Sequence, residues 1–350
     1  MKTIRVKFLK FGNTDQTTPG TYANFFYSLL KKYYNVEISD KPDYIFYNEA
    51  NDAHLKYDCV KIFYTGENVS PDFNFCDYAI GFDWLDFSDR YYRFPIYLNS
   101  IFYRKDELEQ AKDVDWTKNA SLTLQDIKNK TDFCSFVYSN YRGEKARHAL
   151  FQTLSTYKTV NAGGAYLNNV GGPIANKLAF EAKHKFSIAC ENSSRSGYTT
   201  EKIIGSFMSN TIPIYWGDPD IGKQFNEKRF INCHAYKNFE EVLERIKQID
   251  ADDELYLSIV NEPIANDDYN FLEVKNELDA FLQNIFDRPS QSAFRATINP
   301  NRKSEMIVRQ KISALYVVCK LYLIKLAAYI YQPFKRFSLL EKIKHSLFRI

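Results

Sequence analysis

The hydrophobic and polar positions along the chain alternate between the patterns of strands and helices. Residues 1–8 alternate charged and apolar side chains with a period of two, which predicts a first strand. Residues 22–33, after a Pro-Gly pair, predict a helix. Four short apolar runs then predict strands, at residues 36–38, 44–47, 61–64 and 78–82. This repeated order favours an α/β architecture over a β-sandwich or a helical bundle.

A second run of the same kind follows a polar stretch at residues 106–130, where we place a domain boundary. The expected strands lie at residues 133–138, 186–189 and 212–216. The expected helices lie at residues 144–157, 200–208, 239–249 and 271–286, with a glycine-rich loop at 162–165. We therefore expect one α/β domain over residues 1–125 and a second over 126–290, with a linker and tail over 291–350.

The tail differs from the rest of the chain in charge. Although the whole chain carries a net charge of +3, residues 302–350 carry +9, which leaves −6 on the first 301 residues. Residues 312–331 are apolar with two internal lysines, and residues 334–350 predict a second basic helix. This pattern suits amphipathic helices that lie on an anionic membrane surface with their lysines reaching the headgroups. A helix pair that packs in the core or in a dimer is the alternative.

Composition excludes several other classes of protein. With 25% charged and 45% hydrophobic residues, the chain has the composition of a folded globular protein. The six cysteines form no C-x-x-C pair, which argues against a zinc ribbon or a thioredoxin-type site and indicates a reducing compartment. The charged N-terminus offers no export signal. The five histidines lack the spacing of metal ligands, and the basic excess lies on an apolar tail, so we expect no nucleic acid partner.

Residues 186–217 are the stretch richest in candidate chemistry. A strand leads into a polar loop with Glu191 and Asn192, and the next helix has Glu201 and Lys202 in its first turn. Helix N-termini at the carboxyl edge of a parallel sheet bind phosphates and nucleotides. Glu201 can accept hydrogen bonds from ribose hydroxyls, and Lys202 can meet a phosphate. A surface helix with a capping threonine and ordinary charges is the alternative.

This stretch resembles the donor-binding signature of the α1,3-fucosyltransferases, glycosyltransferase family 10, and is closest to bacterial members. Three blocks carry the resemblance: FSIACENS at 186–193, YTTEK at 198–202 and PIYWG at 213–217. Cys190 stands where an aromatic residue is usual, and Thr199 where valine is usual. The resemblance implies a GT-B-like α/β fold, with two Rossmann-like domains facing a central cleft, plus the basic helical tail.

The resemblance also assigns roles to residues outside the signature. Block 63–68 (FYTGEN) resembles the acceptor-domain block of the family, in which the glutamate is the general base, and this implies that role for Glu67. The donor contacts that it implies lie at Arg147, Val160, Gly163, Asn192, Tyr198, Glu201 and Lys202. Without the resemblance, Glu67 is an ordinary turn glutamate and Arg147 an exposed helix charge. Near the acceptor block, Phe75, Tyr78 and Trp84 are the aromatic side chains that we expect to pack on sugar faces.

The resemblance implies an inverting transfer of L-fucose from GDP-fucose to the 3-hydroxyl of N-acetylglucosamine in a β-galactosyl-N-acetylglucosamine glycan, with a Lewis x-type product. The D-x-D spacings at 113–115, 218–220 and 250–252 are close to chance, so we expect no obligatory metal or cofactor, and at most stimulation by a divalent cation. We expect a cytoplasmic protein associated with the inner face of the membrane. Another nucleotide sugar as donor, and a non-catalytic glycan-binding protein at the membrane surface, are the alternatives.

Overall fold

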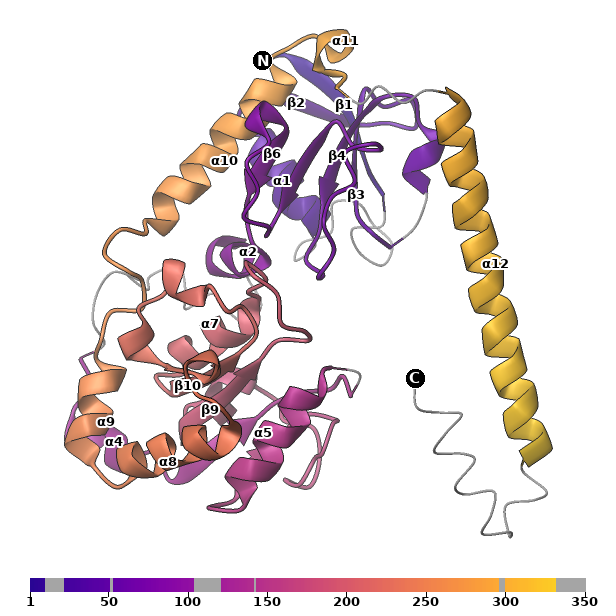
Figure 1. The fold of residues 1–350 in the computed structure, drawn as a ribbon. Coiled ribbons are helices and arrows are strands. Elements are labelled where there is room, and N and C mark those ends of the chain that lie inside the picture. The colour runs from indigo at the N-terminus through magenta and orange to yellow at the C-terminus, as the bar shows by residue number, and fades with distance from the viewer. Residues whose placement is uncertain (10–21, 51–52, 104–120, 142, 296–299, 332–350) are drawn as a thin grey trace. The chain divides into compact units, whose positions relative to one another are not determined.

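The computed structural model describes residues 1–9, 22–50, 53–103, 121–141, 143–295 and 300–331. They fall into two compact units, Met1–Ala296 and Thr297–Ile350, and each is described by itself. The first unit contains two parallel β-sheets with helices on their faces, so the expected α/β fold is confirmed (Figure 1). Whereas we expected the linker to begin at residue 291, this compact unit extends to Ala296.

The N-terminal sheet has six parallel strands in the order β2-β1-β3-β4-β5-β6. The strands are β1 (Thr3–Leu9), β2 (Asn35–Ile38), β3 (Tyr44–Tyr47), β4 (Val60–Tyr64), β5 (Tyr78–Gly81) and β6 (Tyr91–Arg93). The apolar runs predicted all but β6, which has only three residues and no alternation long enough to detect. Because neighbouring strands are parallel, their carboxyl ends meet at one edge of the sheet.

The aromatic residues of the N-terminal half form much of the core of this sheet. Its helices are α1 (Tyr22–Leu30), α2 (Ile96–Tyr103) and α10 (Phe271–Phe286). Phe46 of β3 stacks on Phe26 of α1, with ring centroids 4.8 Å apart, and on Phe286 of α10 at 6.2 Å. The helix α10, late in the chain, therefore closes the core of the first sheet, which the linear order of elements did not predict.

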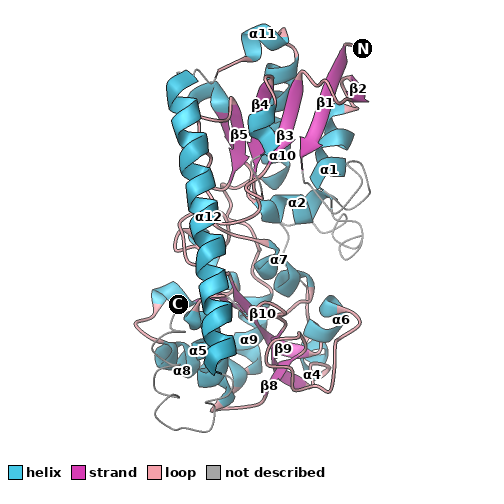
Figure 2. Cartoon of the chain, turned by 90° about the vertical axis from the view of Figure 1, so that its right-hand side faces the viewer, coloured by secondary structure: helices cyan, strands magenta, loops and turns pink. Residues whose placement is uncertain are grey.

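The C-terminal sheet has five parallel strands in the order β11-β10-β9-β7-β8. Three of them, β8, β9 and β10, are labelled in Figure 2. The strands are β7 (Asp132–Phe136), β8 (Val160–Ala162), β9 (His184–Cys190), β10 (Ile212–Trp216) and β11 (Ile231–Asn232). The helices of this half are α4 (Leu124–Lys128), α5 (Lys145–Ser155), α6 (Lys177–Glu181), α7 (Glu201–Met208), α8 (Phe239–Asp250) and α9 (Asp253–Val260). Two short strands, β8 and β11, and two helices, α6 and α9, were not predicted.

Short helical turns complete the first unit. The 3-10 turns are Ala53–Lys56, Ser88–Arg90, Ile221–Lys223, Glu227–Arg229 and Cys233–Ala235. The last helix of the unit, α11 (Ser290–Ala293), is followed by Arg295, which forms an ion pair with Asp89 at 2.6 Å. This ion pair connects the end of the unit to the 3-10 turn that precedes β6.

The second unit contains one long helix, α12 (Pro300–Tyr331), which begins well before the expected residue 312. The second basic helix expected at 334–350 lies outside the described residues. The exposed apolar side chains of α12 are Val308, Ile312, Leu315, Tyr316, Val317, Val318, Leu321, Tyr322, Leu323 and Leu326. Since successive residues turn by about 100° around a helix, the run 315–318 covers the whole circumference and not one amphipathic face. None of the described helices has the length and hydropathy needed to cross a membrane.

Candidate active site

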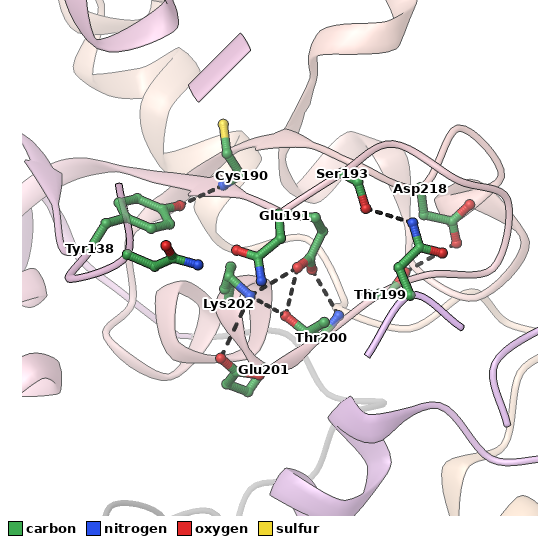
Figure 3. A network of polar contacts seen from close by, with 12 residues as sticks. Tyr138, Cys190, Glu191, Ser193, Thr199, Thr200, Glu201, Lys202 and Asp218 are labelled. Atoms are coloured by element: carbon green, nitrogen blue, oxygen red, sulfur yellow. Dashed lines mark hydrogen bonds and ion pairs between the residues drawn. The ribbon is translucent and has the colours of Figure 1, made fainter. Parts of the chain in front are cut away.

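A hydrogen-bonded network at the start of α7 organises the carboxyl edge of the C-terminal sheet (Figure 3). Glu191, the residue after β9, is fully buried, and its two carboxylate oxygens accept the backbone N–H of Thr200 at 2.7 Å and the Thr200 hydroxyl at 2.6 Å. Lys202 donates to the same carboxylate at 3.0 Å. Thr200 is the N-cap residue of α7, but its side chain makes no capping bond to the helix and donates to Glu191 instead.

The network keeps Lys202 charged. Burial by itself lowers the pKa of this amine, but the neighbouring carboxylates of Glu191 and Glu201 outweigh it and raise the pKa. Glu201 lies 3.7 Å from the Lys202 ammonium as an ion pair. The side chain of Lys202 keeps 15% of its surface exposed, so the charge lies at the boundary between the protein interior and solvent. A cation in this position can meet an anionic ligand at the helix N-terminus.

Arg147, in the first turn of α5, lies buried with only 1% of its surface exposed. One terminal nitrogen donates to the backbone oxygen of Glu191 at 3.0 Å and to Oδ1 of Asn192 at 2.8 Å. The guanidinium also lies over the ring of Tyr138, 4.1 Å from the centroid. Arg147 is therefore not the exposed helix charge that its sequence context allowed, and it connects α5 to the loop after β9.

These groups line a pocket of about 260 Å³ in the C-terminal half. Its charged lining residues are Arg147, Lys177, Glu181, Glu201 and Lys202, and Asn192 also lines it. Four of the predicted donor residues, Arg147, Asn192, Glu201 and Lys202, thus line one cavity that holds three cations. This arrangement can bind an anionic group such as a diphosphate.

Lys177 and Glu181 are pocket residues that the sequence analysis missed. They form an ion pair across one turn of α6 at 3.7 Å. Burial raises the pKa of Glu181, which also accepts a hydrogen bond from Ser187 at 3.2 Å. The only sequence signal for this pair is the i, i+4 spacing of opposite charges, which is common on surface helices.

Glu67 lies in the turn after β4, at the carboxyl edge of the N-terminal sheet. Its backbone N–H donates to the Thr65 hydroxyl at 3.0 Å. Partial burial and the negative charge of Glu49 raise the pKa of the Glu67 carboxyl, the positive charge of Lys202 opposes this shift, and Glu201 adds to it. The carboxylate therefore lies within electrostatic reach of the donor-side pocket residues Glu201 and Lys202.

The residue next to Glu67 attaches this turn to the loop after Glu191. Asn68 donates to the Ser193 hydroxyl at 2.5 Å and accepts from the Arg195 guanidinium at 3.1 Å. Arg195 also pairs with Asp83, which follows β5, at 2.5 Å. These contacts join the carboxyl edges of the two sheets beside Glu67.

Three of the expected donor residues lie in packed positions, and their role in donor binding stays a prediction. Val160 is buried in β8, opposite Cys134 of β7. A Cβ on Gly163 would lie 2.8 Å from Ile174 Cγ2, so its lack of a side chain serves packing within the protein. Tyr198 is buried with its ring 5.1 Å from that of Phe82, in an edge-to-face contact between the two halves. None of the three lines the 260 Å³ pocket.

Two of the three candidate aromatic residues near the acceptor block are also core residues. Phe75 and Tyr78 are buried. Trp84 keeps 43% of its surface exposed and stacks under the Arg93 guanidinium, 3.6 Å from the ring centroid. Of these three, only Trp84 is exposed to solvent, and Lys223 also lies over its ring, 5.0 Å from the centroid.

The aspartate pairs that resembled metal motifs have other partners. Asp218 accepts the backbone N–H of Gly197 at 2.8 Å and the Thr199 hydroxyl at 3.1 Å. Asp250 pairs with Lys158 at 2.5 Å. The pair at 113–115 lies outside the described residues. Within the described part of the chain, no group of three His, Cys, Asp or Glu side chains is arranged to hold a metal ion.

The two parallel sheets, with a pocket lined by three cations in the C-terminal half, define a protein with the GT-B fold of glycosyltransferases. Residues 6–103 match the N-terminal domain of the alpha-(1,3)-fucosyltransferase FucT, and residues 127–261 match the C-terminal region of glycosyltransferase family 10 (fucosyltransferase). The chain belongs to this α1,3-fucosyltransferase family, glycosyltransferase family 10.

Individual relatives support the same assignment. The chain is 36% identical to the alpha-(1,3)-fucosyltransferase FucT of Helicobacter pylori over 268 residues, which is 69% of this chain and 56% of that protein. It is 25% identical over 168 residues to the human 4-galactosyl-N-acetylglucosaminide 3-alpha-L-fucosyltransferase 9, with 46% of this chain and 45% of that protein covered. The chain thus spans about half the length of these relatives.

Solved structures of an alpha1,3-fucosyltransferase have the same fold. The structure with GDP-fucose matches with a TM-score of 0.62 and 29% identity, over 83% of this chain and 93% of that chain. The structure with GDP matches with a TM-score of 0.65 and 27% identity, over 85% and 93%.

Proposed function

We propose that the chain transfers L-fucose from GDP-fucose to the 3-hydroxyl of N-acetylglucosamine in a β-galactosyl-N-acetylglucosamine glycan, with inversion at the fucose C1. The observation that carries the proposal is the position of Glu67, whose carboxyl is within electrostatic reach of Lys202 and Glu201. Similarity to a structure that holds GDP-fucose supports the donor. The name of the human relative supports the acceptor and the linkage.

In the proposed mechanism, Glu67 is the general base. Its carboxylate accepts the proton of the acceptor hydroxyl while that oxygen attacks C1 of fucose from the face opposite the diphosphate. The bond from C1 to the β-phosphate oxygen breaks, and its electron pair stays on the departing GDP. The raised pKa of Glu67 favours proton acceptance, because a more basic carboxylate is the stronger proton acceptor.

On the donor side, the cations of the pocket stabilise the leaving diphosphate. Lys202, held by Glu191, lies at the N-terminus of α7 and meets a phosphate, while Arg147 supports the loop that carries Asn192 and adds positive charge to the same cavity. Glu201, half-buried beside Lys202, is the candidate for the ribose hydroxyls. Charge that develops on the diphosphate is met by preorganised groups, so the transition state is stabilised more than the bound donor.

The decisive experiment is a transfer assay with GDP-fucose and an acceptor panel that contains N-acetyllactosamine, with the product linkage read by NMR. We expect an α1,3-linked fucose on N-acetylglucosamine. A Glu67→Gln variant is expected to lose transfer by more than about a hundredfold while it still binds GDP in calorimetry. Calorimetric binding of UDP-sugars in preference to GDP-fucose would overturn the assignment of GDP-fucose as the donor. Unimpaired transfer by Glu67→Gln would overturn the assignment of Glu67 as the general base.

We also propose that residues 302–350 hold the protein at the cytoplasmic, inner face of an anionic membrane. The support is the charge of +9 in this segment together with the exposed apolar side chains of α12. The lysines Lys311, Lys320 and Lys325 are interspersed with those apolar residues. At about 1 kcal/mol per basic residue near an anionic surface, a few lysines suffice for reversible binding.

Vesicle flotation tests this membrane proposal on the full chain. Vesicles with anionic phosphatidylglycerol should carry the protein upward, and zwitterionic phosphatidylcholine vesicles should not. The triple change Lys311→Glu, Lys320→Glu and Lys325→Glu should abolish flotation and leave transfer to a soluble acceptor unchanged. Equal flotation of the triple variant would overturn the electrostatic part, and protein that stays at the bottom with both lipids would overturn the proposal.

A further inference from the structure

A second carboxylate, Glu49, is coupled to Glu67 through a buried threonine. The strands β3 and β4 pair with Tyr47 opposite Phe63, and Glu49 and Thr65 each lie two residues beyond this pair. The register therefore brings the two turns together at the same edge of the N-terminal sheet. Thr65 itself is buried, with only 2% of its surface exposed.

The hydroxyl of Thr65 connects the two glutamates. It donates its proton to Oε2 of Glu49 at 2.8 Å, and its oxygen accepts the backbone N–H of Glu67 at 3.0 Å. The backbone oxygen of Glu67, at 3.2 Å, competes for the same proton. A hydroxyl has one proton to give, and the charged carboxylate is the stronger acceptor. Glu49 thus orients the Thr65 hydroxyl, whose oxygen accepts the backbone N–H of Glu67.

We propose that Glu49 is a positioning residue for the reaction, which sets the geometry of the turn that carries Glu67 through Thr65 and places a second negative charge near the Glu67 carboxylate. This inference rests on the proposed function, in which Glu67 is the general base. Glu49 is not one of the residues that line the donor pocket. Its action on the reaction is therefore indirect, through Thr65 and through its charge.

The charges around Glu67 allow the effect of Glu49 to be separated from the others. Partial burial and the charge of Glu49 raise the pKa of the Glu67 carboxyl, whereas Lys202 lowers it and Glu201 raises it. Lys202 and Glu201 belong to α7 and are paired with each other. Of these three charges, only that of Glu49 comes from the sheet that carries Glu67. A change at Glu49 therefore alters the base and leaves the α7 network in place.

The first test is Glu49→Gln, which removes the charge and keeps an oxygen that can accept the Thr65 proton. A ¹³C NMR titration of glutamate carboxyls, with the Glu67 signal assigned from Glu67→Gln, reads the result without any need for turnover. We expect the Glu67 pKa to fall by about half a unit and the acid limb of kcat/KM to move by the same amount to lower pH. The matched control, Glu37→Gln on β2 of the same sheet, should leave both values unchanged. A Glu67 pKa equal to that of the unchanged protein would overturn the electrostatic part of the proposal.

The second test separates positioning from charge. Thr65→Val removes the hydroxyl and keeps the charge of Glu49, so we expect kcat to fall about tenfold with the acid limb in place and calorimetric GDP affinity retained. Thr65→Ser keeps the hydroxyl, and we expect it to restore kcat even if the valine variant folds poorly. Full kcat in Thr65→Val would overturn the positioning part. If Glu67→Gln retains full transfer, the proposed role of Glu67 as general base is wrong. The NMR titration of Glu49→Gln still tests the effect of Glu49 on the Glu67 carboxyl, because it requires no turnover.

Discussion

The ammonium of Lys202 lies 3.0 Å from Oε2 of Glu191, a carboxylate that is fully buried at the end of β9. The same carboxylate accepts the backbone N–H of Thr200, the N-cap residue of α7. A negative charge at this end of a helix is favourable because it lies at the positive end of the helix dipole. The pair therefore fixes both the start of α7 and the cation of the candidate donor pocket.

Removal of Glu191 should destabilise the protein strongly. Glu191→Ala leaves Lys202 without its carboxylate partner and leaves the backbone N–H and hydroxyl of Thr200 without their acceptor. We expect the free energy of unfolding to fall by about 3 kcal/mol. Urea unfolding at neutral pH measures this loss of unfolding free energy. The control is Glu244→Ala on α8, an exposed glutamate whose loss should cost less than about 0.5 kcal/mol. Equal stability of the two variants would contradict a structural role for Glu191.

The pH dependence of the Glu191 contribution follows from the raised pKa of Lys202. A lysine whose pKa is raised on folding contributes stability below its unfolded pKa of about 10.4 and loses this contribution as the pH rises through the folded value. The difference in unfolding free energy between the unchanged protein and Glu191→Ala should therefore stay constant from about pH 6 to 9 and shrink only in strong alkali. Urea unfolding across this range checks it, and a steep change near neutral pH would show that another group carries the effect.

The acid limb of transfer should lie above the pH at which an ordinary glutamate ionises. Burial and Glu49 raise the pKa of Glu67 from its usual 4.5, and a general base acts only when ionised. Activity should therefore rise with pH through this raised pKa and be lost below it. Profiles of kcat/KM against pH measure the limb, with GDP binding at each pH as the control for donor affinity. An acid limb at or below pH 4.5 would contradict the assignment of Glu67.

Gly217 is required because Glu191 packs against it. A Cβ at position 217 would lie 2.4 Å from Glu191 Cγ, in the middle of the buried network. At Gly222 the nearest atom is Oε2 of Glu227, at 2.6 Å, the far end of a side chain that can move. We expect Gly217→Ala to lower the free energy of unfolding by about 2 kcal/mol and to weaken GDP binding, and Gly222→Ala to do neither. Thermal melts and calorimetry compare the two, and a neutral Gly217→Ala would contradict the close packing.

Lys177 should contribute to binding of the donor diphosphate although no sequence motif marks it. It lines the same pocket as Arg147 and Lys202. Lys177→Gln is expected to weaken GDP binding about tenfold, since a charge-assisted contact is lost, while Lys183→Gln, two residues beyond α6, should bind GDP as the unchanged chain does. Calorimetry with GDP and with guanosine separates a phosphate contact from a base contact. An equal loss for guanosine would contradict the phosphate role.

Much of the fold follows from local pattern. The alternation of charged and apolar residues in β1 predicts a strand with one covered face. The largely apolar run of β7 predicts a strand whose two faces are both covered. The signature residues Glu201 and Lys202 were placed correctly at the start of a helix because a threonine and the apolar period of α7 mark that boundary. Three-residue strands such as β6 carry no such period, so they could not be predicted.

The sequence by itself determined the α/β class, the family and the segment that carries the candidate donor site. Only the tertiary structure decided that Val160 and Tyr198 are core residues, that Lys177 and Glu181 line the pocket, and that Glu49 reaches Thr65. The physical reason is that burial and charge coupling depend on which strands are neighbours. Tyr47 and Phe63 are paired across β3 and β4 although 16 residues separate them, and this register, not the local sequence, brings Glu49 to the turn of Glu67.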